Sequence, residues 1–188
     1  YFHKVVDCQW ACPAHTPVPE YIRLIAAGQY SDAYMVNWKS NVFPGILGRT
    51  CDRPCEPACR RSRVEEGNQP LREGSAPTAP KAEPVAICRL KRVTADYKDP
   101  DEIKKRVSLP KGKPNGRRVA CVGAGPASLT VARDLAPLGY DVTVFDQDHR
   151  AGGMIWTQIP RFRLPMEVID EEVNYILDLG VTFKQRKI

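Results

Sequence analysis

The sequence lacks any long hydrophobic run. Hydrophobic residues make up 43% of the chain, which is ordinary for a globular protein. No apolar stretch, however, approaches the roughly 18 residues that a membrane helix needs. The charged and apolar regions of a secretory signal are missing, and no internal repeat is visible. We therefore expect no membrane span and a cytoplasmic location.

Because the chain begins at Tyr1 and stops at Ile188 just after a predicted strand, we also expect a piece of a longer protein.

The sequence also lacks the residue patterns of hydrolytic enzymes. No arrangement of Ser, His and Asp, and no pair of carboxylates, suggests a nucleophile or a general acid. We expect His15 and His149 at the surface, and Glu171 and Glu172 on the solvent-facing side of their helix. Hydrolytic chemistry is therefore not supported.

Aromatic residues are scarce where positive charge is concentrated. The chain has a net charge of +6, and eleven Lys or Arg against four Asp or Glu lie between Arg89 and Arg118. This segment holds one aromatic residue, Tyr97, and several prolines and glycines. A nucleic-acid site would need a structured basic face, so we expect no nucleic-acid partner. Residues 99–116 are predicted to form a basic, solvated linker.

Cysteines are present in an odd number and in short groups. Cys8 and Cys12, and then Cys51, Cys55 and Cys59, follow one another at four-residue intervals. Seven cysteines in this spacing do not suggest a disulfide framework, and clustered reduced thiols usually bind metal. Zinc sites favour C-x₂-C pairs over the C-x₃-C pairs found here. The spacing therefore favours an iron–sulfur cluster over zinc.

A glycine-rich turn lies between a predicted strand at 118–122 and a predicted helix at 126–135. It reads Gly123-Ala124-Gly125-Pro126-Ala127-Ser128. The first glycine permits a tight turn, the second allows close approach of a pyrophosphate, and Ser128 is small enough to replace the third glycine. The helix N-terminus then faces the negative charge. The context predicts a bound dinucleotide.

Two further features specify this dinucleotide site. Asp146 ends a second predicted strand and is positioned to accept hydrogen bonds from ribose hydroxyls. The pair Gly152-Gly153 follows it, and such a pair shortly after the ribose-binding acid is typical of flavoproteins. We therefore expect FAD rather than NAD(P), with an ordinary loop as the alternative for the glycine pair.

Cys121, inside the first strand, is interpreted as a core residue.

The predicted fold class is α/β, with an α-helical iron–sulfur domain followed by the start of a Rossmann-like, doubly wound FAD-binding domain. Residues 1–98 form the first domain, with a mobile proline-rich loop at 70–84, and residues 117–188 form part of the second. Two helices are expected within 19–38, with Gly28 as a C-terminal cap and Ser31 as an N-cap. Further helices are expected at 84–97 and 165–179, and a third strand begins at Val181.

The order of these parts resembles the small subunit of glutamate synthase and the N-terminal half of dihydropyrimidine dehydrogenase. The resemblance covers nearly the whole chain. Its most specific pieces are Cys12-Pro-Ala, Gly48-Arg-Thr-Cys51, Cys55-Glu-Pro-Ala-Cys59, Pro84-Val-Ala-Ile, the glycine-rich turn, and Ile159-Pro-Arg-Phe-Arg-Leu-Pro165. It implies FAD, [4Fe-4S] clusters, and NAD(P)H bound outside the residues of this chain. It also implies a larger catalytic partner subunit and ferredoxin-like subunits.

The resemblance also implies cluster ligands. Cys12, Cys51 and Cys55 match ligands of one cluster. The family's fourth ligand falls at about Lys91, but lysine is a poor ligand. We therefore propose Cys88, which lies one turn earlier on the same helix. The alternative is that Cys88 is a core cysteine.

Cys8 and Cys59 match ligands of a second cluster. Its remaining ligands would lie at and before His3, and Leu47 occupies a position where relatives often carry another cysteine. The number of clusters, one or two, is left open.

The sequence therefore predicts an NAD(P)H-dependent oxidoreductase subunit that transfers electrons between NAD(P)H, FAD and [4Fe-4S], and onward to or from a catalytic partner. The main alternative is a zinc-stabilised assembly subunit without catalysis. A flavin disulfide reductase is less favoured, because the cysteine groups are separate from the predicted flavin region.

Overall fold

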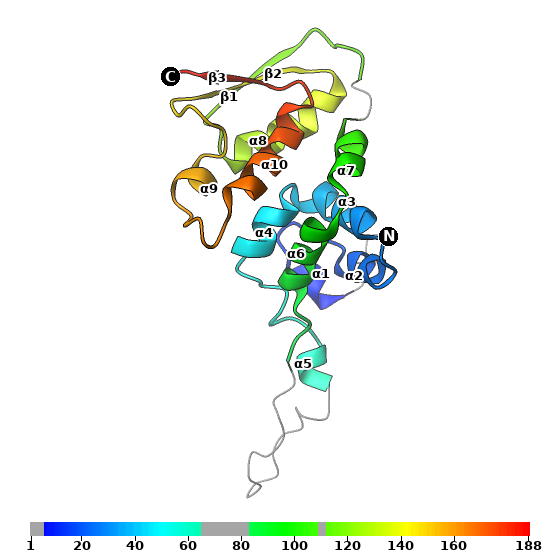
Figure 1. Cartoon of the computed structure of the whole chain (residues 1–188). Coiled ribbons are helices and arrows are strands. Elements are labelled where there is room, and N and C mark those ends of the chain that lie inside the picture. Colours follow the sequence, from blue (N-terminus) through cyan, green and yellow to red (C-terminus); the bar gives the residue numbers. More distant parts are fainter. Residues whose placement is uncertain (1–5, 65–82, 109–111) are drawn as a thin grey trace, which may run out of the picture. The chain divides into compact units, whose positions relative to one another are not determined.

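The structure is a computed structural model that describes residues 6–64, 83–108 and 112–188. It divides into two compact units, Tyr1–Tyr97 and Lys98–Ile188, which are described separately (Figure 1). The loop predicted at 70–84 lies almost wholly outside the described residues, as does His3. Within the described ranges, no helix combines the length and hydrophobicity that crossing a membrane requires.

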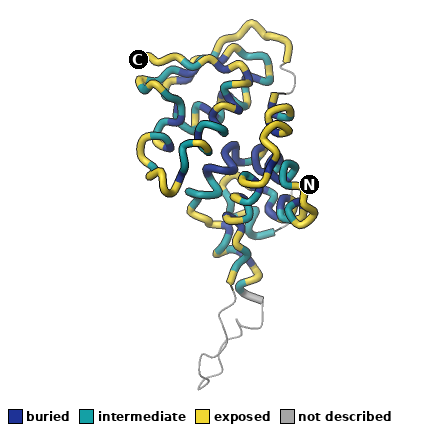
Figure 2. The backbone as a smooth tube through the Cα atoms, in the orientation of Figure 1, coloured by how far each residue is buried: buried dark blue, intermediate teal, exposed yellow. Residues whose placement is uncertain are grey.

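The first unit is helical. Its helices are α1 (Asp7–Ala11), α2 (Val18–Ala26), α3 (Tyr30–Asn41), α4 (Pro44–Thr50), α5 (Arg61–Val64) and α6 (Ile87–Tyr97). One face of α2, formed by residues three apart, is buried, as expected for an amphipathic helix. Tyr21, Ala33 and Tyr34 are fully buried, and Ile87 of α6 packs in one hydrophobic cluster with Tyr21 and Ala33. In Figure 2 the buried backbone follows these helices through the interior of the unit.

The predicted helices of the first unit are present with shifted ends. Gly28, with φ at +73°, separates α2 from α3. The Ser31 N-cap prediction is wrong, because α3 already begins at Tyr30. Only Val42 and Phe43 separate α3 from α4, whose first residue, Pro44, has the fixed φ that suits a helix start.

Helices α4 and α6 approach each other closely. A Cβ added to Gly48 of α4 would lie 2.8 Å from the Cα of Arg92 in α6. Only glycine allows this approach. The approach brings the C-terminal end of α4, which leads to Cys51, against α6. Helix α6 begins at Ile87 rather than at the predicted Pro84.

The second unit begins with a helix in the segment predicted to be a linker. Helix α7 (Pro100–Val107) has Asp99 as its N-cap, and the Asp99 side chain accepts hydrogen bonds from the N–H groups of Asp101 and Glu102. Ile103 and Val107 are buried. The segment 99–116 is therefore partly structured, because a capping aspartate and a proline start a helix despite the high charge.

A three-stranded parallel sheet forms the centre of the second unit. Its strands are β1 (Arg118–Val122), β2 (Asp141–Asp146) and β3 (Thr182–Gln185), in the order β1-β2-β3. In register, Cys121 lies beside Val144, and Val144 beside Phe183. Helix α8 (Pro126–Leu135), the short 3-10 helix η2 (Ala136–Leu138), α9 (Met154–Thr157) and α10 (Met166–Leu177) connect the strands. Helices α8 and α10 pack side by side against the sheet (Figure 1).

This arrangement confirms the predicted fold class: a helical segment followed by the start of a Rossmann-like sheet. Cys121 is buried, as a core residue should be. The prediction for Glu172 is wrong, because its exposed fraction is only 1%. Glu171 accepts hydrogen bonds at 2.8 Å from Lys98 Nζ and from the Tyr175 hydroxyl. A helical pattern could not reveal this buried polar side of α10.

Candidate iron–sulfur and dinucleotide sites

Four cysteines of the first unit gather from three helices and one turn. Cys12 follows α1, Cys51 follows α4, Cys55 lies in the turn after it, and Cys88 lies in the first turn of α6. All carry free thiols. Burial, opposed by the charge of Lys91 and supported by the charges of Cys12 and Cys51, raises the pKa of Cys55 to about 11. These four are called the cysteine quartet below.

Within the quartet, Cys51 and Cys88 are in direct contact. Their side chains share a hydrogen bond, which lowers the pKa of the Cys51 thiol and raises that of Cys88. The backbone N–H of Arg53 also donates to Cys51 Sγ at 3.3 Å, and the ammonium of Lys91 lowers the pKa further. Because thiolates are the metal-binding form of cysteine, these contacts favour metal binding at Cys51.

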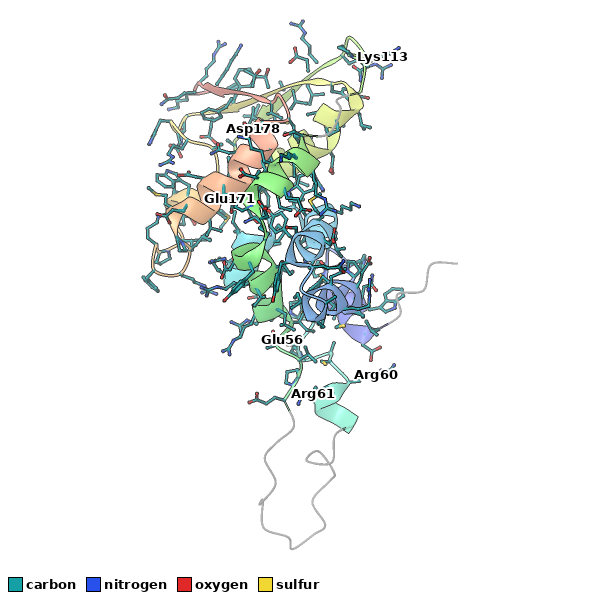
Figure 3. All side chains as sticks on the ribbon, turned by 45° about the vertical axis from the view of Figure 1, so that its right-hand side comes forward. Glu56, Arg60, Arg61, Lys113, Glu171 and Asp178 are labelled. Atoms are coloured by element: carbon teal, nitrogen blue, oxygen red, sulfur yellow. The ribbon has the colours of Figure 1, made fainter. Side chains whose placement is uncertain are left out.

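The start of α6 is fixed by two side chains from other segments. The carboxylate of Glu56 accepts a hydrogen bond from the backbone N–H of Cys88 at 3.1 Å, and Figure 3 shows Glu56 beside this end of α6. The hydroxyl of Tyr21 donates to the carbonyl of Ile87 at 3.0 Å. Burial, followed by the charges of Cys55 and Cys88, raises the pKa of Tyr21, so its phenol remains a donor. Neither Tyr21 nor Glu56 was identified from the sequence.

Cys12 has its own polar support. Its Sγ lies 3.5 Å from the hydroxyl oxygen of Thr16, a residue that is 1% exposed. The Thr16 oxygen in turn accepts hydrogen bonds at 3.3 Å from Ser40 and from Asn41. When Cys12 is a thiolate, the Thr16 hydroxyl is positioned to donate to its sulfur.

Cys8 and Cys59 line a small pocket of about 230 Å³, and Cys8 also packs against the hydrophobic cluster that contains Cys55. The pocket is lined by Val6, Asp7, Cys8, Cys59, Arg60 and Arg61. Burial, and then the charge of Cys59, raises the pKa of Cys8. The exposed side chain of Arg60 forms an ion pair with Asp7 at 2.7 Å. His3, the further ligand position considered above, lies outside the described residues.

In the described part of the chain, no three or more His, Cys, Asp or Glu side chains converge on a point that could hold one metal ion. A tetrahedral single-ion site requires all its ligands around one centre. A [4Fe-4S] cluster instead takes one thiolate at each of four separate irons. The donor set of the quartet fits a cluster in its chemistry, since four free thiols come from separate segments and Cys51, Cys55 and Cys88 interact with one another and with Lys91.

The dinucleotide turn has the predicted form. Gly123 has φ at +88°, and its N–H donates to the carbonyl of Phe145 at 2.7 Å, which ties the turn to β2. Gly125 is the N-cap of α8 and supplies no side-chain cap. A Cβ added to Gly125 would meet nothing within 4 Å. The first N–H groups of α8, at Ala127 and Ser128, therefore face open space where a pyrophosphate can bind.

Asp146 is held close to this turn. Its carboxylate accepts hydrogen bonds from the N–H of Ala124 at 2.6 Å and from that of Asp148 at 2.9 Å. A carboxylate has about four acceptor positions, so two remain for ribose hydroxyls. A pocket of about 310 Å³ lies beside it at the carboxyl ends of the strands, lined by Val122, Gly123, Phe145, Asp146, Gln147, Arg186, Lys187 and Ile188. Ligands of open α/β sheets bind at this edge.

The pair Gly152-Gly153 packs directly against the dinucleotide turn. The N–H of Gly152 donates to the carbonyl of Ala124 at 2.8 Å. A Cβ added to Gly153 would lie 2.8 Å from the Cα of Gly125, and Gly153 has φ at +52°. These two residues therefore support the turn in a way that a loop of other residues would not allow. The sequence suggested that the pair mattered but not this contact.

Comparison with known proteins agrees with both parts of the chain. Residues 3–103 match the family model of dihydropyrimidine dehydrogenase domain II, 4Fe-4S cluster. Residues 121–182 match the model of an NAD(P)-binding Rossmann-like domain. The predicted iron–sulfur and dinucleotide-binding character of the chain is therefore confirmed. The match to an iron–sulfur family argues against the alternative of a zinc-stabilised subunit.

Similar proteins include subunits of several oxidoreductases. The chain is 36% identical to the beta subunit of the NADP(+)-dependent formate dehydrogenase of Moorella thermoacetica, over 93% of this chain and 25% of that protein. It is 31% identical to PreT, a subunit of the NAD-dependent dihydropyrimidine dehydrogenase of Salmonella typhimurium, over 94% of this chain and 38% of that protein. The beta subunit of the NADPH-Fe(3+) oxidoreductase of Geobacter sulfurreducens is also 31% identical, over 95% and 25%.

The chain thus spans between 25% and 38% of the length of these three relatives. The match to the iron–sulfur model, in contrast, covers more than half of the chain itself. The chain belongs to the family of dihydropyrimidine dehydrogenase domain II, which carries a 4Fe-4S cluster.

Proposed function

We propose that this chain is the electron-transfer part of a larger NAD(P)H-dependent oxidoreductase, in which FAD and [4Fe-4S] connect NAD(P)H to a catalytic partner subunit. When bound, the flavin exchanges a hydride and the cluster exchanges single electrons, so together they link two-electron and one-electron chemistry. The similar oxidoreductase subunits support this proposal. We also retain the expectations of a ferredoxin-like subunit, a cytoplasmic location, and an NAD(P)H site outside these residues.

The observation that carries the proposal is the cysteine quartet. Cys51 and Cys88 share a hydrogen bond, and the charges of Cys12 and Cys51 act to raise the pKa of Cys55. We therefore propose Cys12, Cys51, Cys55 and Cys88 as the ligands of one [4Fe-4S] cluster. Cys8 and Cys59 supply only two thiols at their own pocket in the described residues, so a second cluster there needs ligands from elsewhere.

We propose FAD for the dinucleotide site. The close contact between Gly153 and the Cα of Gly125 supports this assignment, because the backbone then borders the bound dinucleotide without an intervening side chain. Asp146 offers its two remaining acceptor positions to the ribose. Ala124, Pro126, Ala127 and Ser128 complete the cofactor-binding turn in this proposal. We also propose that residues 1–98 and 117–188 act as the two cofactor domains.

The cluster assignment is tested with Cys55→Ala in the full-length protein purified without oxygen. We expect this variant to lose about four iron atoms per chain, since one cubane cluster is lost, and to keep its flavin. Cys121→Ala is the matched control, because Cys121 is a buried free thiol in β1 of the other unit, and it should keep all its iron. Full iron content in Cys55→Ala would refute the ligand assignment.

The flavin assignment is tested with Gly125→Val. The φ of −77° at Gly125 suits any residue, so the substitution fills the open space without straining the backbone. We expect the flavin to be lost and the iron content to be unchanged, which makes iron the internal control. Unchanged flavin occupancy would move the site away from this turn.

A further inference from the structure

Lys91 is buried in the first unit beside the cysteine quartet. Its exposed fraction is 6%, although lysine is rarely buried unless it is paired. It lies on α6 three residues after Cys88, so both side chains project from the same side of the helix.

Lys91 interacts electrostatically with three thiols of the quartet. Its ammonium opposes the burial that raises the pKa of Cys55, and it acts in the same direction on Cys51 and Cys88. In the described ranges no carboxylate forms an ion pair with it. The two nearby acids have other partners. Glu56 accepts from the N–H of Cys88, and Asp96 binds Arg49 and Arg92.

A cation in this position has a defined physical effect on a cluster. Four thiolates bring negative charge into a region of low dielectric, and reduction adds one more electron. A fixed positive charge nearby stabilises the reduced form more than the oxidised form. The electron comes from the reductant, and Lys91 neither gains nor loses a proton in this step.

We propose that Lys91 is a charge-compensating residue that raises the reduction potential of the cluster held by the quartet. This inference rests on the ligand set proposed above. It assigns to Lys91 an electrostatic role that does not require the lysine to bind iron. A neutral side chain of similar length would leave the cluster ligated and make it harder to reduce.

The test is a reductive titration of the full-length protein, followed by electron paramagnetic resonance of the signal that disappears in Cys55→Ala. The variants are Lys91→Met, which removes the charge, and Lys91→Arg, which keeps it. Arg89→Met is the matched control, because Arg89 is an exposed cation on the same helix. For Lys91→Met we expect the ratio of reduced to oxidised cluster to fall at least tenfold at a given potential, which is about 59 mV for a one-electron couple. Lys91→Arg and Arg89→Met should each change the ratio less than about threefold.

Each outcome separates the inference from the function on which it rests. If the unmodified protein lacks iron, the proposed function fails. If Lys91→Met holds its full iron content and its titration is unchanged, only the role of Lys91 fails. Cluster loss in Lys91→Met with retention in Lys91→Arg also overturns the inference, because a neutral side chain is expected to leave the cluster ligated. Cluster loss in both variants overturns it, because the lysine itself is then required.

Discussion

Cys51 at the end of α4 and Cys88 in the first turn of α6 share a side-chain hydrogen bond. This contact depends on the close approach of the two helices, which Gly48 permits. Cys88 also places its Sγ 3.4 Å from the carbonyl oxygen of Leu47, one turn before Cys51. The helix pair therefore brings Cys88 beside Cys51, as our proposal of Cys88 as the fourth ligand requires.

Replacing Cys88 with alanine tests this fourth position. We expect Cys88→Ala to lose the cluster, because three thiolates leave one iron without a protein ligand. Iron content and the visible spectrum measure the loss, and Cys121→Ala again serves as the control. If Cys88→Ala keeps its iron and spectrum, Cys88 is only a core residue.

Replacing Tyr21 with phenylalanine tests how the start of α6 is held. The variant loses the hydrogen bond to the Ile87 carbonyl, so we expect the free energy of unfolding to fall by about 1 kcal/mol. Tyr97, at the other end of α6 and 68% exposed, provides the control. Urea denaturation should show a change below about 0.5 kcal/mol for Tyr97→Phe. Equal effects in the two variants would contradict a specific role for the Tyr21 hydroxyl.

Asp96 links α4 to α6 through a partly buried ion-pair network. Its carboxylate accepts hydrogen bonds from Arg49 at 2.6 Å and from Arg92 at 3.0 Å. Burial acts to raise the pKa of Asp96, but these two arginines more than offset it and lower the pKa below its ordinary value. A lowered pKa in the folded state means that the stabilisation is present above the ordinary pKa and is lost as the pH falls through the folded value.

We therefore expect Asp96→Asn to lower the free energy of unfolding by up to about 1 kcal/mol at pH 7, because solvent screens these partly exposed ion pairs. The difference between the variant and the unmodified protein should shrink below about pH 4, where the Asp96 carboxyl of the unfolded chain begins to bind a proton, and disappear as the pH falls through the lower folded value. Urea denaturation at several pH values measures both quantities. A difference that stays constant from neutral to acid pH would contradict the electrostatic explanation.

Replacing Gly153 with alanine tests the support of the dinucleotide turn. The added Cβ would lie 2.8 Å from the Cα of Gly125, so the turn must shift, and we expect flavin affinity to fall about tenfold or more, equivalent to at least 1.4 kcal/mol. Gly116→Ala is the matched control. Gly116 also has a positive φ, at +73°, but a Cβ there meets nothing within 4 Å. Flavin titration should distinguish the two variants, and equal affinities would remove Gly153 from the site.

The Rossmann-like unit was predictable from the sequence because its signals are local. The turn at Gly123 and Gly125 lies between an apolar strand and an amphipathic helix, and Asp146 follows at the end of the next strand. Helix α7 also had local signals, an Asp99 cap and Pro100 at its first position. In the prediction, the high charge of residues 99–116 outweighed these two helix signals.

The polar interior of both units was not predictable. Lys91 and Glu172 are charged residues on amphipathic helices, where the usual expectation is exposure, yet both are buried. Tyr21 and Glu56 hold the start of α6 from segments far apart in the sequence, and Thr16, next to Cys12, is itself held by Ser40 and Asn41 of α3. No periodicity identifies such contacts. The cysteine spacing predicted a set of metal-binding thiols, and the role of each cysteine as a ligand stays a prediction.

The most direct test of the central claim is a combined metal and flavin analysis of the full-length protein, purified without oxygen, together with its visible spectrum. The account predicts a coloured protein with about one FAD and at least about four iron atoms per chain, and no stoichiometric zinc. A colourless protein that holds zinc at the quartet, or one in which Cys51 and Cys88 form a disulfide, would contradict it.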